Sequence, residues 1–262
     1  MTNAALHVAR TGLDAQSTRM RVIANNLANV NTTGFKRDRA SFETLAYQAI
    51  TAAGATSSGD DKYAIGTNLG TGVQINGTAR IDTQGSTQVT GNPLDLAIEG
   101  GGYFQIQMPD GKTGYTRAGD FNQSADGRLV TADGMSVLPE ITIPEGATAI
   151  TIGTDGTVSA MLAGQTETSE LGKIQLARFT NAAGLQAAGN NLLTETAASG
   201  APQVGDAGLE GRGLIQQNSL EASNVNVVEE LVDMIETQRA YEVNSKMIKA
   251  TDEMLQYVNQ QL

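Results

Sequence analysis

Residue types that could perform chemistry are scarce in this sequence of 262 residues. It contains one histidine, His7, and no cysteine, which excludes a disulfide scaffold, a thiolate zinc site and a cysteine nucleophile. A catalytic triad or a histidine metal site would have to be built around His7 alone. Because His7 lies within a helical pattern, we interpret it as a polar residue on a helix face.

Two further patterns could suggest a reaction site. Gly100-Gly101-Gly102 precedes a strand-like stretch, whereas a phosphate cradle needs a following helix, so we expect a tight turn. The carboxylate pairs Asp95 with Glu99 and Asp120 with Asp126 could be nominated for glycoside chemistry. With 28 acidic residues in the chain, chance supplies such pairs. We predict no catalytic residue, no cofactor and no metal site.

The charge distribution argues against nucleic acid as a partner. The net charge is −11, and the only basic cluster is Lys36-Arg37-Arg39. Residues 1–40 carry six Lys/Arg and two Asp/Glu, whereas residues 220–262 carry three and eight. This asymmetry could favour packing of one end against the other, or could reflect two solvated faces.

The residue pattern at each end of the chain predicts a helix. The remaining elements lie between these two helices in the sequence. In each predicted helix, apolar residues at heptad spacing form a narrow row, which we call a seam. Such a seam would be buried only in a bundle with helices from other molecules. Asn226, followed by Glu229, is typical of a helix start near Val227, and residues 29–34 are typical of a helix end. The predicted seam residues are Leu6, Leu13, Met20, Ile23, Leu27, Val227, Leu231, Met234, Tyr241, Ile248, Leu255 and Leu262.

The middle of the chain is rich in Gly, Thr, Val and Ile. Asp-Gly pairs at 110–111, 126–127, 133–134 and 155–156 stand between apolar stretches and indicate tight hairpin turns. The fold class predicted is α+β, in which long terminal helices pair as a coiled-coil-like layer around an inserted antiparallel, partly closed all-β domain. The domain boundaries expected are 1–34 with 218–262 for the helical part, 35–71 for an extended linker or locking segment, and 72–217 for the β domain. Residues 46–70 read as a flexible linker.

No cleaved leader or membrane-spanning run is visible in the sequence. Arg10, Asp14, Arg19 and Arg21 interrupt the first thirty residues, and no run approaches about 18 apolar residues. We expect no membrane insertion, and export, if it occurs, without a cleaved signal peptide.

Three long motifs resemble flagellar rod and hook proteins. They are residues 24–36 (ANNLANVNTTGFK), residues 220–242 (from LEASNVNVVEEL to IETQRAYE), and residues 91–100 with 115–119 in the β region. Within this family, the length of the chain and its 46–66 segment resemble those of the distal rod branch. The family-motif residues are Asn25, Asn26, Asn29, Asn31, Gly34, Phe35, Ser223, Asn224, Asn226, Gln238 and Arg239.

The resemblance implies a structural subunit of the bacterial flagellum basal body. It implies uncleaved type III export and helical self-assembly into a hollow driveshaft that transmits torque to the hook. The implied partners are copies of itself, proximal rod proteins, the hook protein and surrounding ring proteins, in a rod that spans the periplasm toward the outer membrane. In a free subunit we expect poorly ordered ends that fold on assembly.

Three other functions remain open on sequence alone. The nearest is a proximal rod or hook subunit of the same family. An extracellular helical-stalk scaffold or adhesin would form discrete oligomers instead of tubes. A peptidoglycan-cleaving enzyme would depend on Asp95, Glu99 and Asp120.

Overall fold

The computed structural model describes residues 2–58, 61–162 and 168–261, and it divides into two compact units. Unit 1 contains residues 1–27, 38–79 and 226–262, and unit 2 contains residues 28–37 and 80–225. The architecture is α+β, with one long helix near each end of the chain, as predicted. The functional division at residues 34, 71 and 217 stays a prediction.

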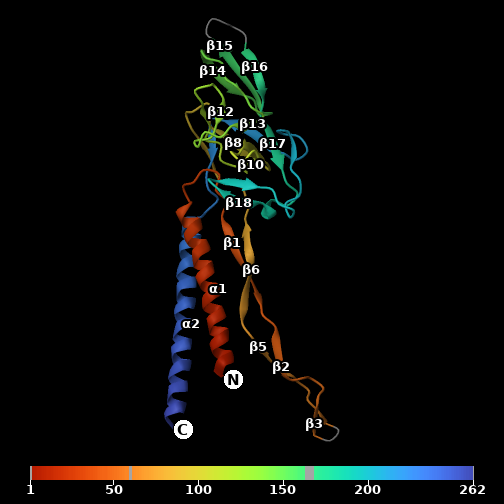
Figure 1. Cartoon of the computed structure of the whole chain (residues 1–262), viewed down its shortest axis with the longest axis vertical. Helices are drawn as coiled ribbons and strands as arrows, with labels where there is room; N and C mark the ends of the chain where they lie inside the picture. The colour runs from red at the N-terminus through yellow and green to blue at the C-terminus, as the bar shows by residue number, and fades with distance from the viewer. Residues whose placement is uncertain (1, 59–60, 163–167, 262) are drawn as a thin grey trace. The chain divides into compact units, whose positions relative to one another are not determined.

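Unit 1 holds both helices and a ribbon of strands (Figure 1). Its strands pair β1 with β6, β2 with β5 and β3 with β4, as in a long hairpin. Its elements are α1 (Thr2–Ala28), β1 (Asp38–Thr44), β2 (Tyr47–Thr51), β3 (Thr56–Ser58), β4 (Asp61–Lys62), β5 (Thr67–Gly70), β6 (Val73–Arg80) and α2 (Val227–Gln261). The segment 46–70 is therefore largely paired strand, where the sequence indicated a flexible linker.

The helix ends follow the sequence signals. The Asn226 side-chain oxygen accepts hydrogen bonds from the backbone N–H groups of Val228 at 3.1 Å and Glu229 at 3.5 Å, which caps α2. α1 ends at Ala28, directly before the Asn/Thr/Gly-rich stretch. Among the described residues, no helix is both long and apolar enough to cross a membrane.

Unit 2 is built from short strands. Its largest sheet has the order β18-β19-β10-β9-β17-β20, with β13 also paired to β9; a second sheet is β14-β15-β16, and β8 pairs with β21, β7 with β22 and β11 with β12. The strands are β7 (Thr87–Val89), β8 (Leu96–Glu99), β9 (Tyr103–Gln107), β10 (Thr113–Thr116), β11 (Asn122–Gln123), β12 (Leu129–Val130), β13 (Val137–Leu138), β14 (Ala147–Ile152), β15 (Thr157–Leu162), β16 (Thr168–Lys173), β17 (Gln175–Arg178), β18 (Gln186–Gly189), β19 (Leu192–Thr194), β20 (Gln203–Asp206), β21 (Leu214–Gln217) and β22 (Ser219–Glu221), and a 3₁₀ turn covers Ala182–Gly184.

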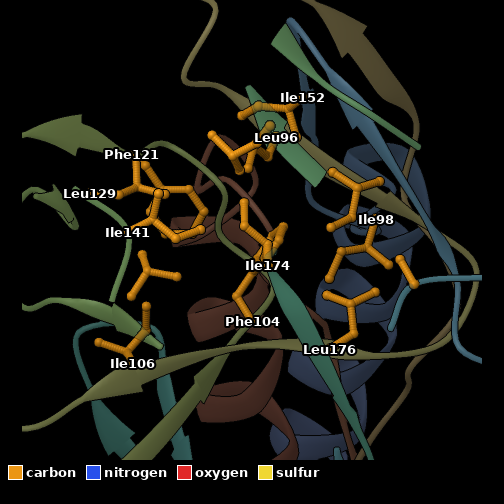
Figure 2. Close-up of a cluster of buried hydrophobic side chains, with 14 of the residues drawn as sticks. Leu96, Ile98, Phe104, Ile106, Phe121, Leu129, Ile141, Ile152, Ile174 and Leu176 are labelled. Atoms are coloured by element: carbon orange, nitrogen blue, oxygen red, sulfur yellow. The ribbon is translucent and has the colours of Figure 1, made fainter. Parts of the chain in front are cut away.

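The central strands of unit 2 are covered on both faces. In β9, Phe104 and Ile106 belong to one buried cluster, whereas Tyr103 belongs to another. Successive side chains of a strand point to opposite faces, so this alternation sorts the residues into two cores. The larger core contains the edge-to-face pair Phe104–Phe121, whose ring centroids are 5.1 Å apart (Figure 2). In the other core, Tyr115 and Phe179 meet in the same way at 4.7 Å.

The four Asp-Gly turns predicted from the sequence are confirmed. Gly111, Gly127, Gly134 and Gly156 all have φ between 79° and 88°. At the first turn, the Gly111 N–H donates to the Met108 carbonyl and the Met108 N–H donates to the Lys112 carbonyl, each at 2.9 Å. The same hydrogen-bond pair recurs at the other three turns, which is a geometry suited to hairpins. Gly100 and Gly102 also have positive φ, in the turn expected between β8 and β9.

The turn glycines differ in the space around them, which predicts unequal effects of substitution. A Cβ at Gly127 would collide with the Ile143 carbonyl oxygen, whereas Gly111 has open space at nearly the same φ. We expect Gly111→Ala to cost about 1 kcal/mol of unfolding free energy through backbone strain alone, and Gly127→Ala to cost at least about twice as much. Urea denaturation followed by near-ultraviolet circular dichroism measures both. Equal losses would contradict the packing described here.

Candidate interaction surfaces and a buried charge cluster

A fully buried carboxylate, Glu221, ends β22 in unit 2. Its side chain forms ion pairs with Lys36 Nζ at 2.6 Å and with an Arg117 guanidinium nitrogen at 3.1 Å. All three side chains are at most 5% exposed. The Gly85 N–H also donates to Glu221 Oε1, at 2.9 Å. One carboxylate therefore balances two cations that come from distant parts of the sequence.

Backbone carbonyls accept further hydrogen bonds from the two cations, although the buried Arg117 Nε has no partner among the described residues. Lys36 Nζ donates to the Thr83 carbonyl at 2.8 Å, and Arg117 donates to the carbonyls of Gly100 at 2.6 Å and Ile98 at 3.3 Å. Burial lowers the pKa of Lys36 below its ordinary value, although the hydrogen bond and the charge of Glu221 oppose this shift. Such a cluster fixes one arrangement of its segments more than it adds stability.

The family motifs hold the segments around this cluster. Gly34 has φ +67° and donates its N–H to the Glu221 carbonyl at 2.7 Å, and a Cβ there would lie 2.6 Å from the backbone of Arg117 and Ala118. The Asn224 side chain donates to the carbonyls of Ile81 and Thr83 and accepts the Arg37 N–H at 2.8 Å. These motif residues therefore join the first and last segments of unit 2.

The other motif residues have simpler surroundings. Phe35 is half-buried and its carbonyl accepts the Asn224 N–H, and the Ser223 hydroxyl accepts the Val225 N–H. The Asn29 side chain accepts a hydrogen bond from the Thr32 hydroxyl. Exposed side chains belong to Asn25, Asn31, Gln238 and Arg239.

In unit 1, α1 and α2 contact each other in antiparallel fashion. Asn26 donates to the Glu230 carboxylate at 3.2 Å, Arg19 pairs with Asp233 at 3.1 Å, and a Cβ on Gly12 would lie 3.1 Å from the Asn244 amide. Asn26 is also fixed to the backbone of Asp38 by two hydrogen bonds. The half-exposed Arg19–Asp233 pair contributes little to stability, so the opposite charges of the two ends are not the main attraction.

The row of α2 that turns inward is polar and small. Among the α2 residues whose burial the structure describes, the buried ones are Glu230, Thr237 and Thr251, and Asn244 on the same heptad row is half-buried. The Thr237 hydroxyl donates to the Asp233 carbonyl at 2.6 Å, and that of Thr251 donates to the Met247 carbonyl at 2.8 Å. Within one chain the helix contact therefore buries few large apolar groups.

The predicted apolar seam of α2 lies beside this row, three residues or roughly 60° away around the helix. Val227, Leu231 and Tyr241 are exposed, and Met234 and Ile248 are half-buried. The side chain of Leu255 and the whole of Leu262 lie outside the described residues. In α1, Ile23 is buried, and Leu6, Leu13, Met20 and Leu27 are half-buried.

A second apolar face of α2 escaped the sequence analysis. Its members are each about half to two-thirds exposed: Val228, Val232, Ile235, Val243, Met247 and Met254. The first three lie roughly 160° around the helix from the nearest residue of the buried row, Val243 roughly 100°, and the two methionines roughly 40–60°. We call this set the outward face. Val232, Val243 and Met254 recur every eleven residues, a spacing that keeps one face of a straight helix and that could have revealed it.

The residues considered for catalysis or metal binding in the sequence have the following surroundings in the structure. His7 is exposed on α1, as predicted, with Nδ1 3.2 Å from the Thr71 carbonyl oxygen. Asp95 bridges to Asp120 in an isolated backbone pairing and accepts a hydrogen bond from Asn92. Burial raises the pKa of Asp120, and the charges of Asp95 and Asp133 add to this shift. Asp126 pairs with Arg128 at 3.1 Å.

Loss of the central carboxylate should destabilise unit 2 strongly. Glu221→Gln leaves Lys36 and Arg117 buried without a counter-charge, so we expect a loss of about 3–5 kcal/mol of unfolding free energy. The matched control is Glu140→Gln, which removes an exposed carboxylate 3.7 Å from the partly exposed Arg128; it should cost less than about 1 kcal/mol. Urea unfolding of the full chain measures both, and losses of similar size would refute the role of the cluster.

Comparison with known proteins links these features to one family. Three family models match: a flagella basal body rod protein model over residues 6–36, the flagellar hook protein FlgE/F/G D1 domain over 97–160, and the flagellar basal body rod FlgEFG protein C-terminal model over 216–261. These matches include α1 with the Lys36 motif, the Arg117 region, and Glu221 with α2.

Relatives that match over almost the full length of the chain indicate the same family. The flagellar basal-body rod protein FlgG of Buchnera aphidicola is 50% identical over 97% of this chain and 98% of its own length, and that of Caulobacter vibrioides is 49% identical over 98% of both. The rod protein FlgF of Caulobacter vibrioides is 37% identical over 93% of this chain and 92% of its own. The chain therefore belongs to the FlgG family of flagellar basal-body rod proteins.

Proposed function

We propose that this chain polymerises helically through its terminal helices into the hollow distal rod that carries torque from the flagellar motor to the hook. The chain is a structural subunit of the flagellar basal-body rod and not an enzyme, since relatives near 50% identity over almost the full length bear that name. The observation that supports the mode of assembly is the outward face of α2, which is apolar and exposed in a single chain.

The helices have two kinds of contact surface, and each suits a different partner. The polar row of Glu230, Thr237 and Asn244 meets α1 of the same chain, whereas the outward face would be buried by other copies. The predicted seam from Val227 to Ile248 flanks both surfaces and would join them in a coiled-coil-like layer. A head-to-tail contact that does not close generates a helical filament.

The environment of the subunit follows from this role. We infer uncleaved type III export and a rod that crosses the periplasm toward the outer membrane. Rod, hook and other basal-body components are its assembly partners; within these, proximal rod proteins, the hook protein and the surrounding rings are the specific contacts proposed. In the free subunit we still expect the helical ends to be less ordered than in the assembled rod.

A charge on the outward face should block polymerisation. Val243 is 59% exposed, so Val243→Asp should leave the subunit folded but raise the concentration needed for assembly by at least about tenfold, which corresponds to about 1.4 kcal/mol. Sedimentation and electron microscopy of the purified chain measure this. The control Gln238→Asp adds the same charge at an exposed site roughly 140° from Val243 around the helix; an equal effect there would contradict the proposal.

The hairpin segment 46–66 is the proposed locking element between neighbouring subunits. Tyr47, Ile50 and Ile65 are exposed apolar side chains that a neighbouring subunit could bury. Deletion of residues 46–66 should leave assembly possible but lower the bending rigidity of the filaments, because these anchors are lost. Cryo-electron microscopy of filament curvature tests this, and unchanged straightness would count against a locking role.

A further inference from the structure

A groove in unit 1 runs between the start of α1 and the hairpin, and we call it the N-terminal groove. Its volume is about 940 Å³. Its walls are Ala4, Ala5, His7 and Val8 of α1 and Gln48, Ile50, Leu69, Gly70 and Thr71 of the hairpin. His7 is the only titratable residue among them, so the groove is apolar and almost uncharged. Within the described part of the chain, α2 supplies none of these walls.

The far end of α2 extends beyond its own partner helix. Asn26 faces Glu230 and Gly12 faces Asn244, and continuing this antiparallel register puts Thr2, the first residue of α1, level with Met254. The described helix continues to Gln261, seven residues further. This overhang is about 10 Å long. By this register the helix extends past the first residue of α1.

The overhang and the groove agree in size. A helical segment about 10 Å long and 10–12 Å wide occupies roughly 800–1,200 Å³. The groove volume of about 940 Å³ lies within this range. The groove is therefore large enough to receive side chains from two turns of helix.

The overhang and the groove also agree in charge. Residues 227–253 contain ten charged side chains, whereas residues 254–262 contain none. Met254 is 62% exposed at the start of this uncharged stretch. Docking the charged part of α2 would bury unpaired charge against an apolar wall, whereas docking the overhang would not.

We propose that the N-terminal groove of one copy of this chain receives the C-terminal overhang of α2 from a second copy. The contact joins two different surfaces, so it is head-to-tail and can propagate along a filament. This inference rests on the proposed polymerisation and adds a specific contact to it. The apolar side chains at the centre of the contact are Ile50, Leu69 and Val8 in the groove and Met254 on the helix.

Cross-linking in the cysteine-free chain tests the contact directly. One batch of chain carries Met254→Cys and another carries Ile50→Cys; the two are copolymerised and treated with a short bis-maleimide. We expect a covalent dimer containing one chain of each kind, found in the polymer fraction. The control mixture pairs Val243→Cys with Ile50→Cys and should yield less than a tenth as much.

A pair of matched substitutions gives a second readout. Ile50→Asp places a charge in the groove wall and should raise the assembly concentration at least tenfold. Asn68→Asp places the same charge on the same hairpin, at an exposed residue outside both the groove and the 46–66 segment, and should change the assembly concentration less than twofold.

The possible failures are distinguishable. If filaments form normally but the Met254–Ile50 dimer does not exceed the control, or if Ile50→Asp and Asn68→Asp behave alike, the groove contact is wrong and the rod function stands. If the unsubstituted chain forms no filaments at all, the proposed function and the groove contact both fail.

Discussion

The fold of unit 2 depends on the neutralisation of two buried cations by Glu221. Lys36 lies 185 residues before Glu221 and Arg117 lies 104 residues before it, yet both reach its carboxylate within 3.1 Å. Because an unpaired buried charge is costly, the first, middle and last segments of the unit must be in place together. Gly34 and Asn224 continue this constraint through the backbone, so the segments that connect with α1 and α2 are held against each other. A rigid β unit with two fixed chain exits suits a subunit that transmits mechanical load.

The helices of unit 1 lack such a tightly fixed buried contact. Their contact within one chain uses Asn26, Glu230 and Thr237, side chains that satisfy hydrogen bonds but bury little apolar area. Stability gained from hydrophobic burial is roughly proportional to that area, so the pair has little to gain from its own chain. The large apolar groups of α2 point elsewhere, toward surfaces that other copies would cover.

Local signals in the sequence predicted the local structure well. The cap at Asn226, the end of α1 and the four Asp-Gly turns depend on neighbouring residues alone, and all are observed. Long-range contacts were not predictable in this way: residues 214–221 carry no Gly or Pro and Leu220 fits the heptad, yet they form β21 and β22 because β8 and β7 pair with them. The pairing of β2 with β5, the Glu221 cluster and the polar row of α2 were missed for the same reason. Their partners are distant in sequence, and polar residues at helical spacing do not indicate that a helix face is buried.

We expect the outward face of α2 to be buried only between subunits. Oxidative footprinting of methionines, read by mass spectrometry, compares the same side chains in the free subunit and in assembled rods. Met247 and Met254 are 49% and 62% exposed in the single chain. We expect the side chains of Met247 and Met254 to become strongly protected from oxidation on assembly. Met108 and Met135, which pack against the core of unit 2, should keep the same oxidation rates. Equal oxidation of Met247 and Met254 in both states would contradict it.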